Sequence, residues 1–247
     1  ITEEGNKMFR LFDFQTFDTE SVLFDETKTG QRHFRIQMFG INEIGETCAF
    51  FVDDFKPFFY VKVPQEWSAE KMVWWFSETK KKCRYSAKYC LSCVVERHRK
   101  LYDFTGDKDF AFAKCTFGNL SALYQFRKII TTSQDVDLPV YESKIPPLLR
   151  YFHIQNISPS GWVLINENNV DTPDTKTTSC TYEYICSTRD IIALPDKETP
   201  VPYKICSVDI EASSSHGDFP LPIKDYKRAA TQFVDALQLR ISKQKLS

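Results

Sequence analysis

The sequence has little glycine, no excess of charge of one sign and no long apolar run. Only eight of its 247 residues are glycine, while 42% are hydrophobic and 21 are phenylalanine, which excludes disorder for most of the chain. Lysine and arginine number 32 against 33 acidic residues, so a polyanion would have to be met by a local basic patch. No apolar stretch approaches the roughly 20 residues of a membrane-spanning helix, and we expect no membrane partner.

The cysteines are scattered and lie mostly inside apolar runs. This pattern favours buried free thiols in a reducing compartment, so we expect an intracellular protein. Cys90 and Cys93 form a C-x-x-C pair, but no second pair or suitably spaced histidine accompanies it. We therefore expect two ordinary thiols there rather than zinc. The chain begins at Ile1 without a methionine, and we expect it to be a piece of a longer protein.

The first 63 residues are expected to form strands. Alternation over residues 33–41 and 47–52, with a glycine-containing turn between them, predicts a β-hairpin. A second group of elements follows it: a strand, a helix capped by Ser68, two strands and a helix capped by Asn119. This order is typical of a ferredoxin-like or RNA-recognition-motif unit. The strands of this unit are expected at 58–63, 90–102, 110–117 and 136–140.

The pattern changes after residue 140. Short strands separated by turns predict a small β-rich module over 141–199, and three prolines in 194–202 predict an extended linker. An amphipathic helix is expected beyond Pro222.

An acidic pair stands in the stretch KICSVDIEASSSHGDFP, residues 204–220. If 204–210 is a strand, Asp209 and Glu211 point from the same face. Paired carboxylates are hard oxygen ligands, which suit Mg²⁺ or Mn²⁺ and two-metal phosphodiester chemistry. An Asp-x-Glu sequence taken alone is more often part of a solvent-exposed strand edge than of a metal site. The residues around it must therefore distinguish the two interpretations.

Residues 207–220 resemble the first exonuclease motif of family B DNA polymerases, in which a strand-borne D-I-E is followed by G-x-F-P. The segments 55–64, 141–154 and 158–163 are also similar to that family's amino-terminal domain. The run from Asp209 to Pro220 looks most like polymerases of nucleocytoplasmic large DNA viruses.

The resemblance implies an α+β fold with two parts. Residues 1–203 would be the polymerase amino-terminal domain, with a ferredoxin- or RNA-recognition-like βαββα subdomain at about 55–140. An OB-like β-rich module would combine 1–54 with 141–200. Residues 204–247 would begin a ribonuclease-H-like 3′–5′ exonuclease domain and would be truncated.

The resemblance also implies roles for individual residues. Asp209 and Glu211 would bind the catalytic Mg²⁺ or Mn²⁺ ions of proofreading, in a two-metal site completed by residues outside this chain. Phe219 would pack against the frayed primer-terminal base, a stacking that tolerates every base. We therefore expect this segment alone to have neither exonuclease nor polymerase activity.

Several further residues are candidates for DNA contact. Lys81, Lys82 and Arg84 stand in a basic run that would either contact phosphates or form a solvated face. His216 lies in the loop beside the motif and is either close to DNA or an ordinary loop residue. Phe110 and Phe112 share one face of their strand, where burial is more common than base stacking.

The sequence thus predicts part of a replicative DNA polymerase. The full-length enzyme would use primer-template and single-stranded DNA and deoxynucleoside triphosphates, with a sliding clamp as a candidate partner, in the host cytoplasm or nucleus if viral. The alternative is a free-standing single-stranded nucleic-acid-binding module with a vestigial acidic strand.

Overall fold

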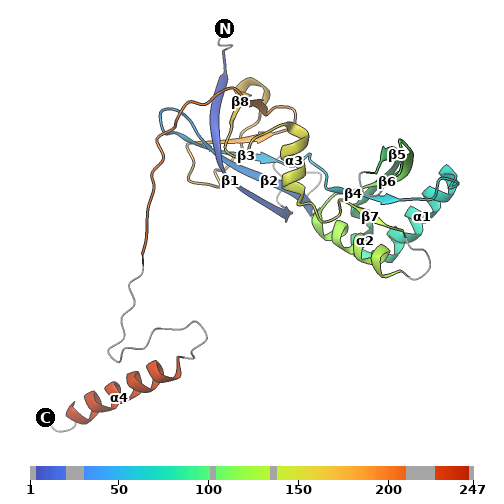
Figure 1. The fold of residues 1–247 in the computed structure, drawn as a ribbon. Coiled ribbons are helices and arrows are strands. Elements are labelled where there is room, and N and C mark those ends of the chain that lie inside the picture. Colours follow the sequence, from blue (N-terminus) through green and yellow to red (C-terminus); the bar gives the residue numbers. More distant parts are fainter. Residues whose placement is uncertain (1–3, 21–30, 101–103, 134–137, 210–225, 245–247) are drawn as a thin grey trace. The chain divides into compact units, whose positions relative to one another are not determined.

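The computed structural model describes residues 4–20, 31–100, 104–133, 138–209 and 226–244 (Figure 1). The chain divides into two compact units, Ile1–Tyr203 and Lys204–Ser247. Among the described residues, no helix combines the length and the apolar character needed to cross a membrane.

A six-stranded sheet forms the first part of the unit Ile1–Tyr203. The predicted hairpin is present, and its turn is held by Asn42, whose Oδ1 accepts hydrogen bonds from the amides of Ile44 and Glu46. Strand β3 (Thr47–Val52) pairs in parallel with β9 (Tyr182–Cys186), whereas the other neighbouring strands are antiparallel. The order is β10-β8-β1-β2-β3-β9, with bounds β1 (Asn6–Thr19), β2 (His33–Ile41), β3 (Thr47–Val52), β8 (Trp162–Asn166), β9 (Tyr182–Cys186) and β10 (Ile192–Leu194).

The core of this sheet is aromatic. The ring centroid of Phe9 lies 5.6 Å from that of Phe50 in an edge-on arrangement, and both side chains are fully buried. A Cβ atom at Gly40 would lie 2.9 Å from the Cβ of Phe9, so the ring packs here because the facing residue is glycine. Close packing of this kind makes the position sensitive to a single added methyl group.

A buried ion pair joins β2 to the turn after β3. Arg35 Nε donates to Asp53 Oδ1 at 2.6 Å, Arg35 Nη2 donates to Asp53 Oδ2 at 2.7 Å, and His33 Nε2 lies 3.0 Å from the same oxygen. The side chain of Arg35 is 5% exposed and that of Asp53 is 14% exposed. Burial alone would raise the pKa of Asp53, but the hydrogen bonds from Arg35 and His33 outweigh burial and hold the pKa below its usual value.

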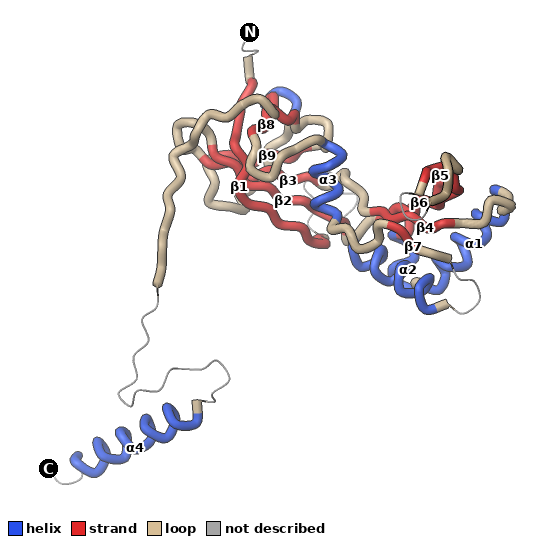
Figure 2. The backbone as a smooth tube through the Cα atoms, in the orientation of Figure 1, coloured by secondary structure: helices blue, strands red, loops and turns tan. Residues whose placement is uncertain are grey.

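A four-stranded antiparallel sheet with two helices forms the second part of this unit. The predicted order of strand, helix, strand, strand and helix is present, and the helices lie along one face of the sheet (Figure 2). The last strand is shorter than expected and begins at Val140; residues 136 and 137 of that prediction lie outside the described residues. The sheet order is β5-β6-β4-β7, with bounds β4 (Phe58–Lys62), α1 (Ala69–Lys82), β5 (Cys90–Arg99), β6 (Asp109–Phe117), α2 (Leu120–Thr132) and β7 (Val140–Tyr141).

Both predicted helix caps are confirmed. Ser68 Oγ accepts from the amide of Lys71 at the start of α1, and Asn119 Oδ1 accepts from the amide of Ala122 at the start of α2. These bonds satisfy amide groups that the first turn of a helix leaves without partners. Phe126 of α2 is fully buried and packs on the aromatic side chains of the sheet below it.

The helix α3 (Pro147–Gln155) was not predicted, because the region was interpreted as short strands. Pro147 occupies the first helical position, where its missing amide hydrogen costs nothing, and Asn156 ends the helix with a left-handed φ of 52°. Tyr151 and Phe152 then pack into the core of the six-stranded sheet. The pair Pro146-Pro147 before an apolar run was the available sequence signal.

The unit Lys204–Ser247 contains the predicted amphipathic helix, α4 (Lys227–Gln244). The predicted strand at 204–210 is wrong for its described part, since Lys204–Asp209 has no regular secondary structure and is exposed. A strand needs a neighbour to satisfy its backbone groups, and the described residues of this unit contain no other strand. The expectation failed because it judged the segment by its own residues alone.

Candidate functional site

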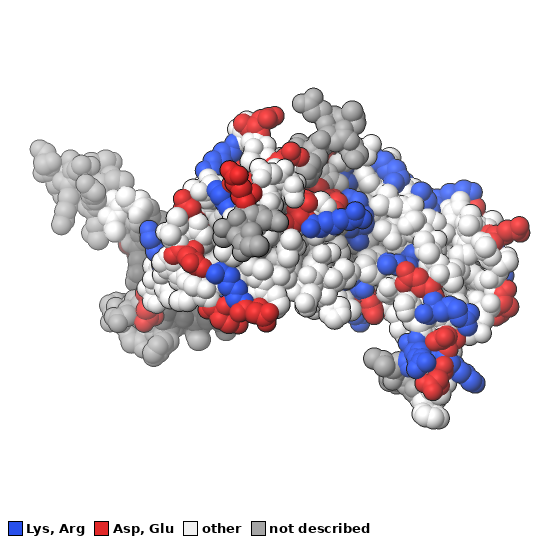
Figure 3. Space-filling model, turned by 90° about the horizontal axis from the view of Figure 1, so that it is seen from above, with Lys and Arg blue, Asp and Glu red and all other residues white. Residues whose placement is uncertain are grey.

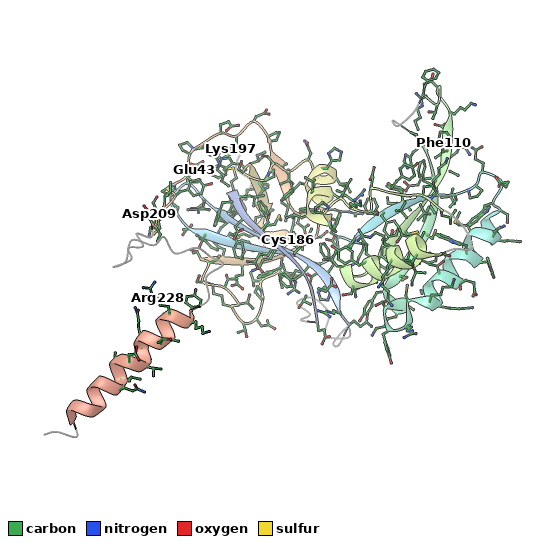
Figure 4. The ribbon with its side chains drawn as sticks, turned by 60° about the horizontal axis from the view of Figure 1, so that its bottom comes forward. Glu43, Phe110, Cys186, Lys197, Asp209 and Arg228 are labelled. Carbon is green, nitrogen blue, oxygen red and sulfur yellow. The ribbon has the colours of Figure 1, made fainter. Side chains whose placement is uncertain are left out.

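The acidic pair is described only in part. Asp209 is exposed, and Figure 4 marks its position at the end of the extended segment that follows Tyr203. Glu211, His216 and Phe219 lie outside the described residues, so their predicted roles stay predictions. Among the residues that the structure does describe, no three His, Cys, Asp or Glu side chains are grouped to hold a metal ion.

The predicted basic residues come together at the end of α1. Lys81 and Lys82 lie in its last turn, and Arg84 follows with a left-handed φ of 50° at the start of the 3-10 helix η2 (Arg84–Tyr89). Lys81 Nζ lies 2.6 Å from Glu78 Oε1, in an exposed pair. Cations at a helix C-terminus also complement the helix dipole. The positions of Lys81, Lys82 and Arg84 are therefore explained equally well by a solvent-exposed face that makes no contact with DNA.

Basic and acidic side chains are interspersed on the surface of the chain. Figure 3 shows both signs side by side over the face that it presents. The near-zero net charge is thus not produced by large separate patches on that face. Any contact with a polyanion there would depend on a few cations rather than on a broad field.

The expectation of mostly buried free thiols is confirmed, since six of the eight cysteines are buried and all eight are unpaired. Cys93 is half-buried on β5, and its Sγ lies 3.9 Å from Cys115 Sγ on the neighbouring strand. Burial and the contact with Cys93 raise the pKa of Cys115. Cys115 is therefore held as a neutral thiol at neutral pH, whereas the same contact lowers the pKa of Cys93.

The face of the four-stranded sheet opposite the helices carries several aromatic side chains, among them Phe110 and Phe112. Along β6, Ala111, Ala113, Cys115 and Phe117 belong to the helix-side core, whereas Phe110 and Phe112 alternate with them and point the other way. Phe112 is buried, as expected, although not against the helices. The period of two in this strand was the signal for two different faces.

A cavity of about 410 Å³ opens on this second face. Four rings meet there: Tyr60 lies 5.4 Å from His98, His98 lies 6.0 Å from Phe112, and Phe112 lies 5.2 Å from Tyr141, measured between ring centroids. The rings come from β4, β5, β6 and β7, so the sheet register itself brings them together. Burial and the neighbouring carboxylate of Glu96 raise the pKa of Tyr60 to about 12. Tyr60 is therefore a neutral hydrogen-bonding group at physiological pH.

Comparison with known proteins identifies relatives of this chain. Residues 138–228 match the family described as DNA polymerase family B, exonuclease domain, and this range crosses from the first unit into the second. The DNA polymerase of Phaeocystis pouchetii virus is 41% identical over 93% of this chain and 24% of its own length. The DNA polymerase of Pyramimonas orientalis virus is 31% identical over 95% of this chain and 20% of its own length. The DNA polymerase delta catalytic subunit of Dictyostelium discoideum is 24% identical over 77% of this chain.

A solved structure shares the fold. The family B DNA polymerase from Pyrobaculum calidifontis aligns with 79% of this chain and 21% of its own chain, with a TM-score of 0.50 and 16% identity. Like the two viral relatives, it is much longer than the region that it shares with this chain. The chain spans about a quarter or less of the length of these proteins.

Proposed function

This chain is a relative of the family B DNA polymerases, and from that premise we propose that it forms the amino-terminal region and the first exonuclease motif of a replicative polymerase. The observation that carries the proposal is the run DIEASSSHGDFP, which lies inside the range matched to the family's exonuclease domain. The full-length enzyme would extend a primer on a DNA template and excise mismatched 3′ ends.

Within this proposal, Asp209 and Glu211 contribute carboxylate oxygens to a site for Mg²⁺ or Mn²⁺. Their donor chemistry fits a hard divalent cation, although only Asp209 is among the described residues. Bound divalent ions would activate water and stabilise the leaving oxygen of the terminal phosphodiester. The exposure of Asp209 is consistent with a site that other acidic residues, outside this chain, complete.

Phe219 would hold the terminal base of the strand being excised. Stacking on an aromatic ring is worth roughly 1–3 kcal/mol for each base and does not depend on its identity, which suits the removal of any mismatch. His216 and the basic residues Lys81, Lys82 and Arg84 would contact the DNA backbone in this proposal. Lys81 and Lys82 would act through their exposed charges at the end of α1.

The domain boundaries follow from the same proposal. The sheet order β5-β6-β4-β7, with two helices on one face, supports a ferredoxin- or RNA-recognition-like subdomain at about 55–140. Residues 1–54 and 141–200 together build the six-stranded sheet, which supports their assignment to one OB-like β-rich module. Residues 204–247 would begin the ribonuclease-H-like exonuclease domain.

The partners in this proposal are those of a replicative enzyme. They are primer-template DNA, single-stranded DNA and deoxynucleoside triphosphates, with a sliding clamp as a further candidate. The viral relatives support an intracellular site of action, in the host nucleus or cytoplasm.

The proposal is tested with the longer protein that contains this sequence. We expect it to extend a matched primer in the presence of Mg²⁺ and all four deoxynucleoside triphosphates, and to shorten a primer with a mismatched 3′ end when nucleotides are withheld. Gel analysis of end-labelled primers measures both reactions. Binding of single-stranded DNA without either reaction would instead support a free-standing binding module.

A further inference from the structure

The aromatic face of the four-stranded sheet is the strongest unassigned feature of the unit Ile1–Tyr203. We define it by the rings Tyr60, His98, Phe112 and Tyr141, which line the cavity of about 410 Å³ together with Arg99, Lys100 and Glu142. A volume of this size falls within the range of small-ligand sites. A sheet face that faced only solvent would more commonly carry polar side chains.

The rings of this aromatic face differ in accessibility. Phe112 is 5% exposed and forms the floor, whereas Tyr60 and Tyr141 are half-buried and His98 is exposed. Tyr141 stands edge-on to Phe112, with an angle of 87° between the two ring planes. A flat ligand entering the cavity would therefore meet ring faces and edges at its wall rather than aliphatic side chains. Contacts between aromatic rings are favourable both when the rings are offset-stacked and when they stand edge-on.

Two lysines lie beside Phe110, the ring that neighbours the aromatic face along β6. Lys62 Nζ lies 4.7 Å and Lys100 Nζ lies 5.6 Å from the centre of the Phe110 ring, at the start of β6 (Figure 4). Arg99 also reaches the cavity, although its Nη1 is 2.9 Å from Asp107 Oδ1 in an exposed pair. Ammonium groups beside aromatic faces supply the two interactions that a nucleotide needs, one for its phosphate and one for its base.

The nearby carboxylates already have cationic partners. Glu96 Oε1 lies 3.3 Å from Lys114 Nζ, and its Oε2 lies 2.9 Å from His98 Nε2. Glu142 Oε2 accepts from Arg150 Nη1 at 2.6 Å. These pairs reduce the negative field at the cavity. A phosphate beside Lys62 and Lys100 is therefore not repelled by an unpaired carboxylate of Glu96 or Glu142.

We propose that this aromatic face binds single-stranded nucleic acid, with one nucleobase in the cavity against Tyr141 and the adjoining phosphates beside Lys100 and Lys62. Inside a duplex each base is covered on both faces by its neighbours in the stack and cannot enter such a cavity, so a single strand is the occupant that fits. The choice of occupant rests in part on the proposed function, because a replicative polymerase handles unpaired template. The site is separate in sequence from the acidic motif and does not depend on its metal.

Binding of the purified 247-residue chain to labelled 12-mers, followed by fluorescence anisotropy, tests this inference. Tyr141→Leu keeps an apolar side chain beside Phe112 but removes the π face, and should weaken binding of single-stranded DNA about 5- to 150-fold. Tyr141→Phe keeps the ring and should bind within about twofold of the unmodified chain. Lys100→Gln should lower the slope of log affinity against log salt by about 0.7.

A matched control comes from the helical layer. Tyr124 of α2 is also partly exposed and also lies beside a cation, Arg127, with 5.2 Å between the guanidinium carbon and the ring centre. Tyr124→Leu should leave binding unchanged. Separate arms with DNA and RNA 12-mers identify which single strand is preferred, and a duplex arm should bind more weakly than either.

Equal binding by Tyr141→Leu and Tyr124→Leu, with both folded by circular dichroism, would overturn the inference. So would equal affinity for duplex and single strands. Neither result would affect the exonuclease assignment, which is measured by excision in the longer protein. Conversely, failure of excision there would leave a positive binding result at Tyr141 intact.

Discussion

Changing Asp209 and Glu211 together to alanine in the longer enzyme should lower 3′–5′ excision on the order of 100- to 1000-fold. The reason is that both carboxylates are proposed metal ligands, and an ion held by fewer oxygen atoms is bound less well and placed less accurately. Primer extension should be unchanged, because the proposed role of the pair is confined to excision. The two rates are measured on the same preparation with mismatched and matched primers.

Asp235→Ala is the control for this pair. Asp235 lies on α4 in the same unit, is exposed, and loses one negative charge on substitution, where the pair loses two. It should leave both rates unchanged. Loss of extension as well as excision in the double variant, Asp209→Ala with Glu211→Ala, would indicate misfolding. Excision at the normal rate in that variant would refute the role of the pair.

Replacing Arg35 with methionine should lower the free energy of unfolding by roughly 3–5 kcal/mol at neutral pH. The substitution leaves the carboxylate of Asp53 largely buried without the two hydrogen bonds that Arg35 donates. His33 would remain as the nearby ring, 3.0 Å from Asp53 Oδ2. Urea unfolding of the 247-residue chain, followed by circular dichroism, measures the loss.

The same pair gives the expected pH dependence. The pKa of Asp53 is lowered in the folded chain, so its contribution is fully present above the unfolded value of about 3.9. The contribution is lost as the pH falls through the lower folded value. Arg35→Met should reduce this acid-dependent loss, since most of the interaction is already absent. An unchanged pH profile would contradict the assignment.

Arg99→Met is the matched control. Arg99 also pairs with an aspartate, Asp107, at 2.9 Å, but the two side chains are 66% and 90% exposed. An exposed pair contributes about 0–1 kcal/mol, so this variant should change stability little. Similar losses for Arg35→Met and Arg99→Met would show that burial is not what makes the first pair important.

Local patterns predicted the four-stranded sheet and its helices well. Ser68 and Asn119 were recognised as caps because each side chain bonds an amide three residues ahead, an interaction within one short segment. The hairpin around Asn42 was predictable for the same reason. In each case the residues that determine the structure are neighbours in the sequence.

The predictions failed where residues far apart in the sequence determine the structure. Lys204–Asp209 has the apolar character of a strand, yet the described part of its unit provides no neighbouring strand. The aromatic face needs the register of four strands before Tyr60, His98, Phe112 and Tyr141 are seen to meet. Period-two alternation assigns each ring to a face but does not show that the faces coincide.

The central claim is that Asp209 and Glu211 belong to an excision site that other acidic residues, outside this chain, complete. Its most direct test is a nuclease assay of the purified 247-residue chain with end-labelled single-stranded DNA and Mn²⁺, beside the longer enzyme. We predict shortening of the DNA by the longer enzyme and none by the chain alone. Cleavage by the chain alone that Asp209→Ala abolishes would contradict the claim.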